Sequence, residues 1–160
     1  MLRFDSIVFD FDGVLTDNLV YLDQNGKEFV VCNRSDGLAF NILKNLEFNL
    51  IIVSTETNPV VSKRGNKLNI PVIQNINKKD KKLLEMHEEK IINLDQTMYV
   101  GNDLNDFRAM LLCKVKCCPA DSHPKIKEIA DIVLKTRGGR GVVREIVEDV
   151  LKINMLDYID

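Results

Sequence analysis

Two acidic residues, Asp10 and Asp12, follow directly after an apolar run at residues 7–9 and precede a glycine turn at Gly13. Alternate residues of a strand share a face, so both carboxylates can meet at the carboxyl end of a short strand. Paired acids in that position suit an oxygen-ligated Mg²⁺ ion, or a nucleophile that works beside an acid/base group. A surface turn after a strand would show the same pattern. The residues at the other strand ends are therefore needed to distinguish a catalytic or metal site from a simple turn.

A second predicted strand, at residues 51–53, ends in two hydroxyl residues, Ser54 and Thr55, which suit a phosphate oxygen. Taken alone, a serine in this place is usually a turn residue. Farther along, a basic stretch at the start of a predicted helix contains Lys78, Lys79, Lys81 and Lys82. By itself, this stretch is typical of the solvated first turn of a helix.

A third predicted strand, at residues 97–100, is followed by a glycine turn and a cluster of oxygen-bearing side chains. The cluster consists of Asn102, Asp103, Asn105 and Asp106. Carboxylate and carbonyl oxygens are the ligands that Mg²⁺ prefers in proteins. The alternative is helix capping by Asn102 or Asp103, since both residue types are good N-caps.

Strands and helices alternate along the chain, and this order positions the polar residues. Further strands are expected at residues 72–73, 115–118 and 132–134, and helices at about 36–46 (capped by Ser35 and Asp36), 58–68, 79–90, 107–112, 124–130 and 142–151. Only an early β-hairpin, signalled by Asn25-Gly26 between two apolar runs, is out of phase. The alternation indicates an α/β fold, a doubly wound and mostly parallel sheet, whose ligands bind at the carboxyl ends of the strands.

Bulk composition predicts one domain over residues 1–160 and excludes several classes of partner. The chain has 45% hydrophobic and 29% charged residues and a formal net charge of −2. That charge leaves no basic surplus for nucleic acid or for a membrane surface, and no apolar run is long enough to span a bilayer. We expect a cytoplasmic protein whose four cysteines are reduced thiols.

In chain order, these strand ends are similar to the four motifs of the haloacid dehalogenase superfamily: DxD, Ser/Thr, Lys and G-(D/N)-D-x-N-D. The resemblance spans nearly the whole chain and implies a Rossmann-like phosphatase. It implies that Asp10 is the nucleophile that forms an aspartyl-phosphate and that Asp12 is the acid/base group. Ser54 would hold a phosphate oxygen, and Lys79 would neutralise charge on Asp10 and on the transferring group. Lys79 is preferred to Lys78 because it aligns with the lysine of the family's Q-G-x-x-(D/N)-K pattern.

The same resemblance implies a Mg²⁺ cofactor held by the Asp10 carboxylate and the Asp12 backbone carbonyl, with further ligands from the cluster after the third strand. Most relatives have aspartate where this chain has Asn102. An amide oxygen carries no net charge, so we expect weaker metal binding. Asp103 and Asp106 are the candidates to compensate, or Asp103 replaces Asn102 as the ligand.

Members of the superfamily often carry a cap domain, but the intervals 12–54 and 54–79 leave no room for one. The chain therefore resembles the capless subgroup that dephosphorylates 2-keto-3-deoxy sugar acids and typically forms homotetramers. A lid for the active site would then come from a neighbouring subunit, and the apolar hairpin at about 19–31 would make oligomer contacts. A hairpin folded against its own sheet is the alternative.

Within this subgroup, the second motif favours a nine-carbon substrate. The octulosonate 8-phosphate branch usually has Ser-Gly-Arg, whereas this chain has Ser-Thr-Glu ending in Glu56. An acid there, followed by Arg64 and Lys67 on one helix face, resembles the branch acting on sialic-acid-type 9-phosphates (KDN or N-acylneuraminate), where the two cations would meet the substrate carboxylate. The candidate substrate contacts are Thr55, Glu56, Arg64, Lys67 and Arg140.

Two alternatives remain open. The first is a 3-deoxy-D-manno-octulosonate (KDO) 8-phosphate phosphatase, against which Glu56 argues. The second is a weakly active or inactive oligomerisation module, related to those associated with sugar-acid cytidylyltransferases. Asn102 favours the module, while the intact Asp10, Asp12 and Lys79 oppose it.

Overall fold

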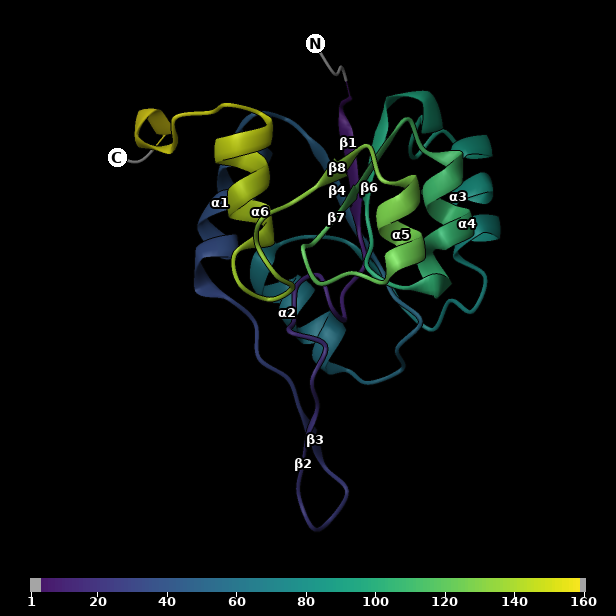
Figure 1. Cartoon of the computed structure of the whole chain (residues 1–160), viewed down its shortest axis with the longest axis vertical. Coiled ribbons are helices and arrows are strands. Elements are labelled where there is room, and N and C mark those ends of the chain that lie inside the picture. Colours follow the sequence, from purple (N-terminus) through teal and green to yellow (C-terminus); the bar gives the residue numbers. More distant parts are fainter. Residues whose placement is uncertain (1–3, 159–160) are drawn as a thin grey trace.

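The computed structural model describes residues 4–158, and its centre is a six-stranded parallel sheet in the order β5-β4-β1-β6-β7-β8 (Figure 1). The strands are β1 (Ser6–Phe9), β4 (Asn49–Val53), β5 (Val72–Ile73), β6 (Thr97–Val100), β7 (Val115–Cys118) and β8 (Ile132–Val133). The central strands β1 and β6 are buried along their whole length, as expected for apolar runs covered on both faces. This confirms the doubly wound α/β fold.

Helices cover both faces of the sheet, and alternate strand residues point to each layer. One face, reached by Ile7 and Phe9, packs against α1 (Arg34–Asn45), α2 (Val60–Leu68) and α6 (Val142–Glu145). The opposite face, reached by Val8 and Tyr99, packs against α3 (Lys79–Glu88), α4 (Phe107–Leu112) and α5 (Pro124–Ile129). Helix α6 continues as a π-helical turn over Ile146–Val150. With this turn counted as part of α6, each helix begins and ends within a few residues of the range expected from the sequence.

The cap of α1 differs from the expectation. The side chain of Asn33, rather than Ser35 or Asp36, caps this helix by accepting from Ser35 N at 2.9 Å. Asp36 is buried and reaches across to α6, where its Oδ1 accepts from the backbone N–H groups of Val143 and Arg144 at 2.9 and 3.3 Å. Asp36 therefore stabilises the start of the last helix, because the first N–H groups of a helix have no partner within it.

The predicted hairpin forms a separate two-stranded sheet of β2 (Tyr21–Leu22) and β3 (Glu28–Phe29), and it projects away from the main sheet (Figure 1). Its turn is closed by the Asp23 carboxylate, which accepts from Asn25 N and Lys27 N at 2.8 and 2.9 Å. Leu22 is 68% exposed, and Tyr21 and Phe29 on the paired strands are about half exposed, so the apolar side chains of β2 and β3 are not covered within one protomer. The alternative of a hairpin folded on its own sheet is therefore wrong.

Two further features bear on the sequence-based expectations. No helix among residues 4–158 is long and apolar enough to cross a membrane. Within residues 4–158 the four cysteines are not joined in disulfides; Cys113, Cys117 and Cys118 are buried and Cys32 is partly exposed.

Candidate active site

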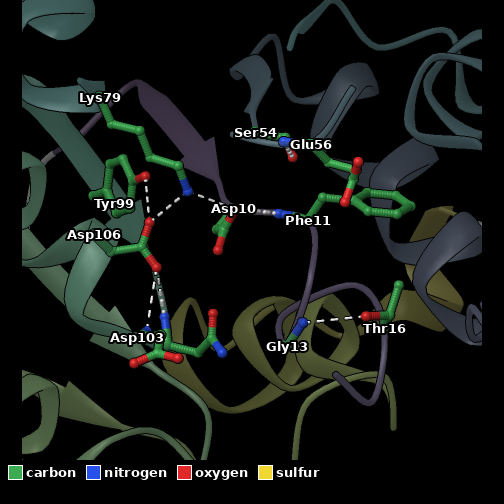
Figure 2. A network of polar contacts seen from close by, with 11 residues as sticks. Asp10, Phe11, Gly13, Thr16, Ser54, Glu56, Lys79, Tyr99, Asp103 and Asp106 are labelled. Atoms are coloured by element: carbon green, nitrogen blue, oxygen red, sulfur yellow. Dashed lines mark hydrogen bonds and ion pairs between the residues drawn. The ribbon is translucent and has the colours of Figure 1, made fainter. Parts of the chain in front are cut away.

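The candidate catalytic residues gather at the carboxyl edge of the sheet. Asp10 follows β1, Ser54 follows β4 and Asn102 follows β6, and these three strands are neighbours. Lys79 is the first residue of α3 and enters the site from the side. Figure 2 shows Lys79, Ser54 and Asp106 arranged around Asp10. Parallel strands end at the same edge, which explains why residues far apart in the sequence meet here.

Lys79 lies between two carboxylates in the interior of the site. Its Nζ is 2.6 Å from Asp10 Oδ1 and 2.7 Å from Asp106 Oδ1, and all three side chains are almost fully buried. Burial alone lowers the pKa of Lys79, but the charges of Asp10 and Asp106 outweigh it and leave the pKa above its usual value. Lys79 is therefore a fixed positive charge beside Asp10, which is the arrangement expected from the sequence.

Asp106 uses both carboxylate oxygens within the protein. Oδ1 accepts from Lys79 Nζ and from the Tyr99 hydroxyl at 2.8 Å, and Oδ2 accepts from the backbone of Asn102 and Asp103 at 2.9 and 3.3 Å (Figure 2). These contacts place Asp106 in a network of protein donors rather than in the direct metal-ligand role expected from the sequence. Its carboxylate instead joins Lys79 to the loop after β6.

Asp103 is also placed differently from the metal-ligand expectation. Its side chain is exposed, and its Oδ1 accepts from Leu104 N at 2.7 Å, so it caps the short 3-10 helix Leu104–Asp106. The structure thus places Asp103 as the helix cap that the sequence offered as the alternative to a metal ligand.

Three oxygen atoms meet beside Asp10. The Asn102 side-chain oxygen lies 3.2 Å from Asp10 Oδ2 and 2.9 Å from the Asp12 carbonyl oxygen, with no donor between them. Mg²⁺–oxygen bonds of about 2.0–2.1 Å in octahedral geometry place neighbouring ligands about 3 Å apart, which matches both separations. Turning the amide would let its NH₂ group donate to both oxygens, and this is the orientation favoured without a cation. The donor set fits Mg²⁺.

The metal-binding capacity depends on carbonyl oxygens as well as on a carboxylate. Within residues 4–158, no three acidic, histidine or cysteine side chains cluster as a metal site. The Asp12 carbonyl and the Asn102 amide are the further oxygen-bearing groups available beside Asp10. Gly13 makes this approach possible: its φ is +84°, and a Cβ there would overlap the Asn102 side chain.

The two acids of the first motif have different surroundings. Burial, and then repulsion by Asp106, raises the pKa of Asp10 well above its usual value, although Lys79 opposes the shift. Asp12 is only partly buried, and its pKa is raised by burial and then by the charge of Glu56. Asp10 is held by Lys79 and by Phe11 N at 2.8 Å, so its position is fixed.

Ser54 and Glu56 follow β4 in a tight turn. Ser54 Oγ accepts from Glu56 N at 3.1 Å, which leaves the hydroxyl hydrogen of Ser54 available for a phosphate oxygen. Glu56 Oε1 accepts from the backbone of Thr57 and Asn58 at 2.7 and 3.0 Å. Thr55 lies between them and is partly buried.

A pocket of about 240 Å³ opens beside Asp12, between the base of the hairpin and the turn after β4. It is lined by Asp12, Asn18, Leu19, Val20, Glu28, Val30, Glu56, Asn58 and Val60. Its titratable side chains are all acidic, so it offers hydrogen-bond acceptors next to the candidate acid/base group. Glu28 lies on the hairpin and is not among the substrate contacts expected from the sequence.

Arg64, Lys67 and Arg140 are not brought to Asp10 within one protomer. Arg64 donates to the Asn33 carbonyl at 2.9 Å, and with Lys67 and Arg34 it lines a separate surface pocket of about 210 Å³. Arg140 is exposed and lies 3.8 Å from the carboxylate of Asp17. Their proposed substrate contacts therefore require either movement or another subunit.

Comparison with known proteins agrees with this geometry. Residues 53–146 match the haloacid dehalogenase-like hydrolase family. The 3-deoxy-D-manno-octulosonate 8-phosphate phosphatase of Escherichia coli K12 is 31% identical over 146 residues, covering 91% of this chain and 78% of the relative.

Solved structures show the same fold. A HAD family hydrolase from Streptomyces avermitilis is 40% identical with a TM-score of 0.88, covering 91% of this chain and 84% of its own. A 3-deoxy-D-manno-octulosonate 8-phosphate phosphatase from Moraxella catarrhalis, solved with magnesium, phosphate and KDO, is 26% identical with a TM-score of 0.90, covering 98% of this chain and 91% of its own.

Proposed function

This chain belongs to the haloacid dehalogenase-like hydrolase family and is a phosphatase, and from that premise we propose that it hydrolyses the phosphate ester of a 2-keto-3-deoxy sugar acid. The first candidate substrate is 3-deoxy-D-manno-octulosonate 8-phosphate, which the curated relatives act on according to their names. The reaction type is supported above all by the ion pair between Lys79 Nζ and the Asp10 carboxylate, which lies beside the three converging oxygen atoms.

In this proposal, the Asp10 carboxylate attacks phosphorus and the ester oxygen leaves, giving an aspartyl-phosphate. Asp12 gives its proton to the leaving sugar oxygen and then takes one from the water that hydrolyses the intermediate. Lys79 neutralises the Asp10 carboxylate and the transferring group, and Ser54 donates to a phosphate oxygen. Asp10, the Asp12 carbonyl and Asn102 would hold Mg²⁺, which when bound supplies positive charge to the phosphate oxygens.

The acidic pocket beside Asp12 supports a polyhydroxylated leaving group. Glu28 and Glu56 can accept hydrogen bonds from sugar hydroxyls, whereas a substrate carboxylate between them would be repelled. The carboxylate of a sugar acid would then point out of this pocket. Arg64 and Lys67 are the cations available for it, and from their separate pocket they serve a neighbouring protomer.

The eight-carbon substrate replaces the nine-carbon one as the leading candidate. The relatives with named substrates reported above act on the octulosonate 8-phosphate, and none of them supports a sialic-acid-type 9-phosphate. The nine-carbon reading stays as a second candidate because Glu56 lines the pocket beside Asp12. The intact network around Lys79 does not favour an inactive oligomerisation module.

We propose further that the protein works as a homo-oligomer, with a tetramer as the leading form, in the cytoplasm. The hairpin exposes Leu19, Val20, Tyr21, Leu22 and Phe29, each about half exposed or more. Contiguous exposed apolar side chains of this kind mark interaction sites, and an isolated two-stranded hairpin is marginally stable in water. A hairpin packed on another copy would also cover the open side of the acidic pocket, which its base helps to form.

The test measures Mg²⁺-dependent phosphate release from KDO 8-phosphate and from a nonulosonate 9-phosphate in parallel, with the Asp10→Asn variant as blank. Higher kcat/KM for the eight-carbon ester, lost in the variant, is the expected result. Preference for the nine-carbon ester would keep the mechanism and overturn the substrate. Release from neither ester, with activity retained on p-nitrophenyl phosphate, would overturn the sugar-acid class.

A further inference from the structure

Lys79 has two competing carboxylate partners, Asp10 and Asp106, and the proposed catalysis requires its charge at Asp10. Its Nζ lies 2.6 Å from Asp10 and 2.7 Å from Asp106, so the two ion pairs are nearly equal in length. In a buried site, a carboxylate with fewer donors attracts a neighbouring ammonium more strongly, because no water takes up its charge. The number of other donors on Asp106 therefore decides how far Lys79 is drawn away from Asp10.

Tyr99 supplies one of those donors to the very oxygen that Lys79 uses. Its hydroxyl donates to Asp106 Oδ1 at 2.8 Å, while the backbone donors from Asn102 and Asp103 occupy Oδ2 (Figure 2). Burial, and then the Asp106 charge, raises the pKa of Tyr99 well above its usual value, so the hydroxyl keeps its proton and stays a donor.

Packing does not by itself explain a tyrosine at this position. Tyr99 is fully buried on β6, and its ring lies in the apolar layer with Leu83, Met86 and Met110. A phenylalanine would fill the same space without placing a polar group in the core, and a buried hydroxyl stabilises only where it has a partner. Among residues 4–158, the hydrogen-bond partner of this hydroxyl is Asp106 Oδ1.

We propose that Tyr99 is a positioning residue, which, by donating to Asp106 Oδ1, keeps Lys79 directed at Asp10 and the phosphoryl group. It touches neither the three converging oxygens nor the pocket beside Asp12, and it acts through Asp106. The proposal rests on the phosphatase activity and is independent of which sugar acid is the substrate.

The test uses Mg²⁺ and p-nitrophenyl phosphate, so it does not depend on the natural substrate. We expect Tyr99→Phe to lower kcat about 10-fold, in line with the loss of one hydrogen bond to a charged group, with KM unchanged within twofold. The matched control is Thr97→Val, which removes a buried hydroxyl from the other end of the same strand, where it donates to the Asn93 carbonyl at 2.7 Å. That control is expected to keep its kcat.

Two further variants separate positioning from packing. In an Asp106→Asn background, Tyr99→Phe is expected to change kcat less than twofold, because the group through which Tyr99 acts is gone. Replacement of Tyr99 by 4-aminophenylalanine, which retains a donor, is expected to recover most of the lost kcat. Equal losses in both backgrounds, a kcat for Tyr99→Phe within twofold of wild type, a rise in KM alone, or no recovery with the amino variant would each overturn the proposal.

Discussion

The Asn102 side-chain amide lies 2.9 Å from the Asp12 backbone carbonyl oxygen, and either its NH₂ group or its oxygen can face that carbonyl. Two acceptors at this distance repel each other unless a cation joins them or the amide turns. The pair therefore links the third predicted strand end to the first, by a hydrogen bond when the NH₂ group faces the carbonyl and by two candidate ligand oxygens when the amide oxygen does. In the second orientation, the amide oxygen would be a metal ligand that adds no charge.

We expect Asn102→Asp to bind Mg²⁺ more tightly. The added negative charge lies beside Asp10 Oδ2, so the Mg²⁺ concentration that gives half-maximal activity should fall about 10-fold. Titration of phosphate release against Mg²⁺ measures this value. Asp103→Asn is the matched control, since its exposed side chain caps Leu104 and should leave the midpoint unchanged. A midpoint that moves only in the Asp103 variant would make Asp103 the ligand instead.

Loss of the Lys79 charge should affect both activity and stability. Lys79→Met leaves Asp10 and Asp106 buried without their common cation, so kcat should fall about 100- to 1,000-fold. The free energy of unfolding should fall by about 3–5 kcal/mol, as for other broken buried ion pairs. Steady-state kinetics and urea unfolding measure the two effects. Lys78→Met, at the exposed neighbouring position, should change neither, and a loss of activity there would assign the catalytic role to Lys78.

The buried Asp36 should make stability depend on pH. Burial raises its pKa from 3.8 to about 6, and its Oδ2 has no hydrogen-bond partner. Between these two values the folded state binds more protons than the unfolded state, so the contribution of Asp36 to stability rises as pH falls through this window, by about 3 kcal/mol in total.

Asp36→Asn tests this directly, because Oδ1 of asparagine can still accept from Val143 and Arg144. Urea unfolding of both proteins between pH 4.5 and pH 8 should show the variant gaining most at high pH, with the difference shrinking towards low pH. A difference that is independent of pH would contradict the shifted pKa.

The exposed hairpin should control assembly. Leu22→Asp places a charge at the most exposed apolar position of β2 and should dissociate the oligomer, as measured by sedimentation velocity. Leu111→Asp is the control, because Leu111 is 54% exposed on α4, away from the hairpin. A wild-type protein that sediments as a monomer at micromolar concentration would remove the basis for a lid from a neighbouring subunit.

Much of this molecule is predictable from its sequence because short apolar runs end in polar residues. Buried strands such as β1 need continuous apolar residues, and parallel strands bring their ends to one edge, so Asp10, Ser54 and Asn102 could be placed together in advance. The hairpin was equally predictable, since Asn25-Gly26 has a strong local turn preference.

The remaining features depend on contacts between distant segments. Asp36 looks like a local cap, yet it serves a helix more than 100 residues away. Asp106 looks like a metal ligand, yet Lys79 and Tyr99 occupy its Oδ1. In the sequence, Tyr99 resembles an ordinary core residue of a buried strand. The feature that could have suggested another role is its hydroxyl group, which lies among apolar residues.

The most direct test of the whole account is to trap phosphate on the protein. Wild-type enzyme with Mg²⁺ and ³²P-labelled KDO 8-phosphate would be quenched in acid within one turnover and mapped by peptide mass spectrometry. The account predicts one phosphoryl group on the peptide containing Asp10, with no label in the Asp10→Asn variant. Rapid release of phosphate from this ester with no label on Asp10, or with label on another residue, would contradict it.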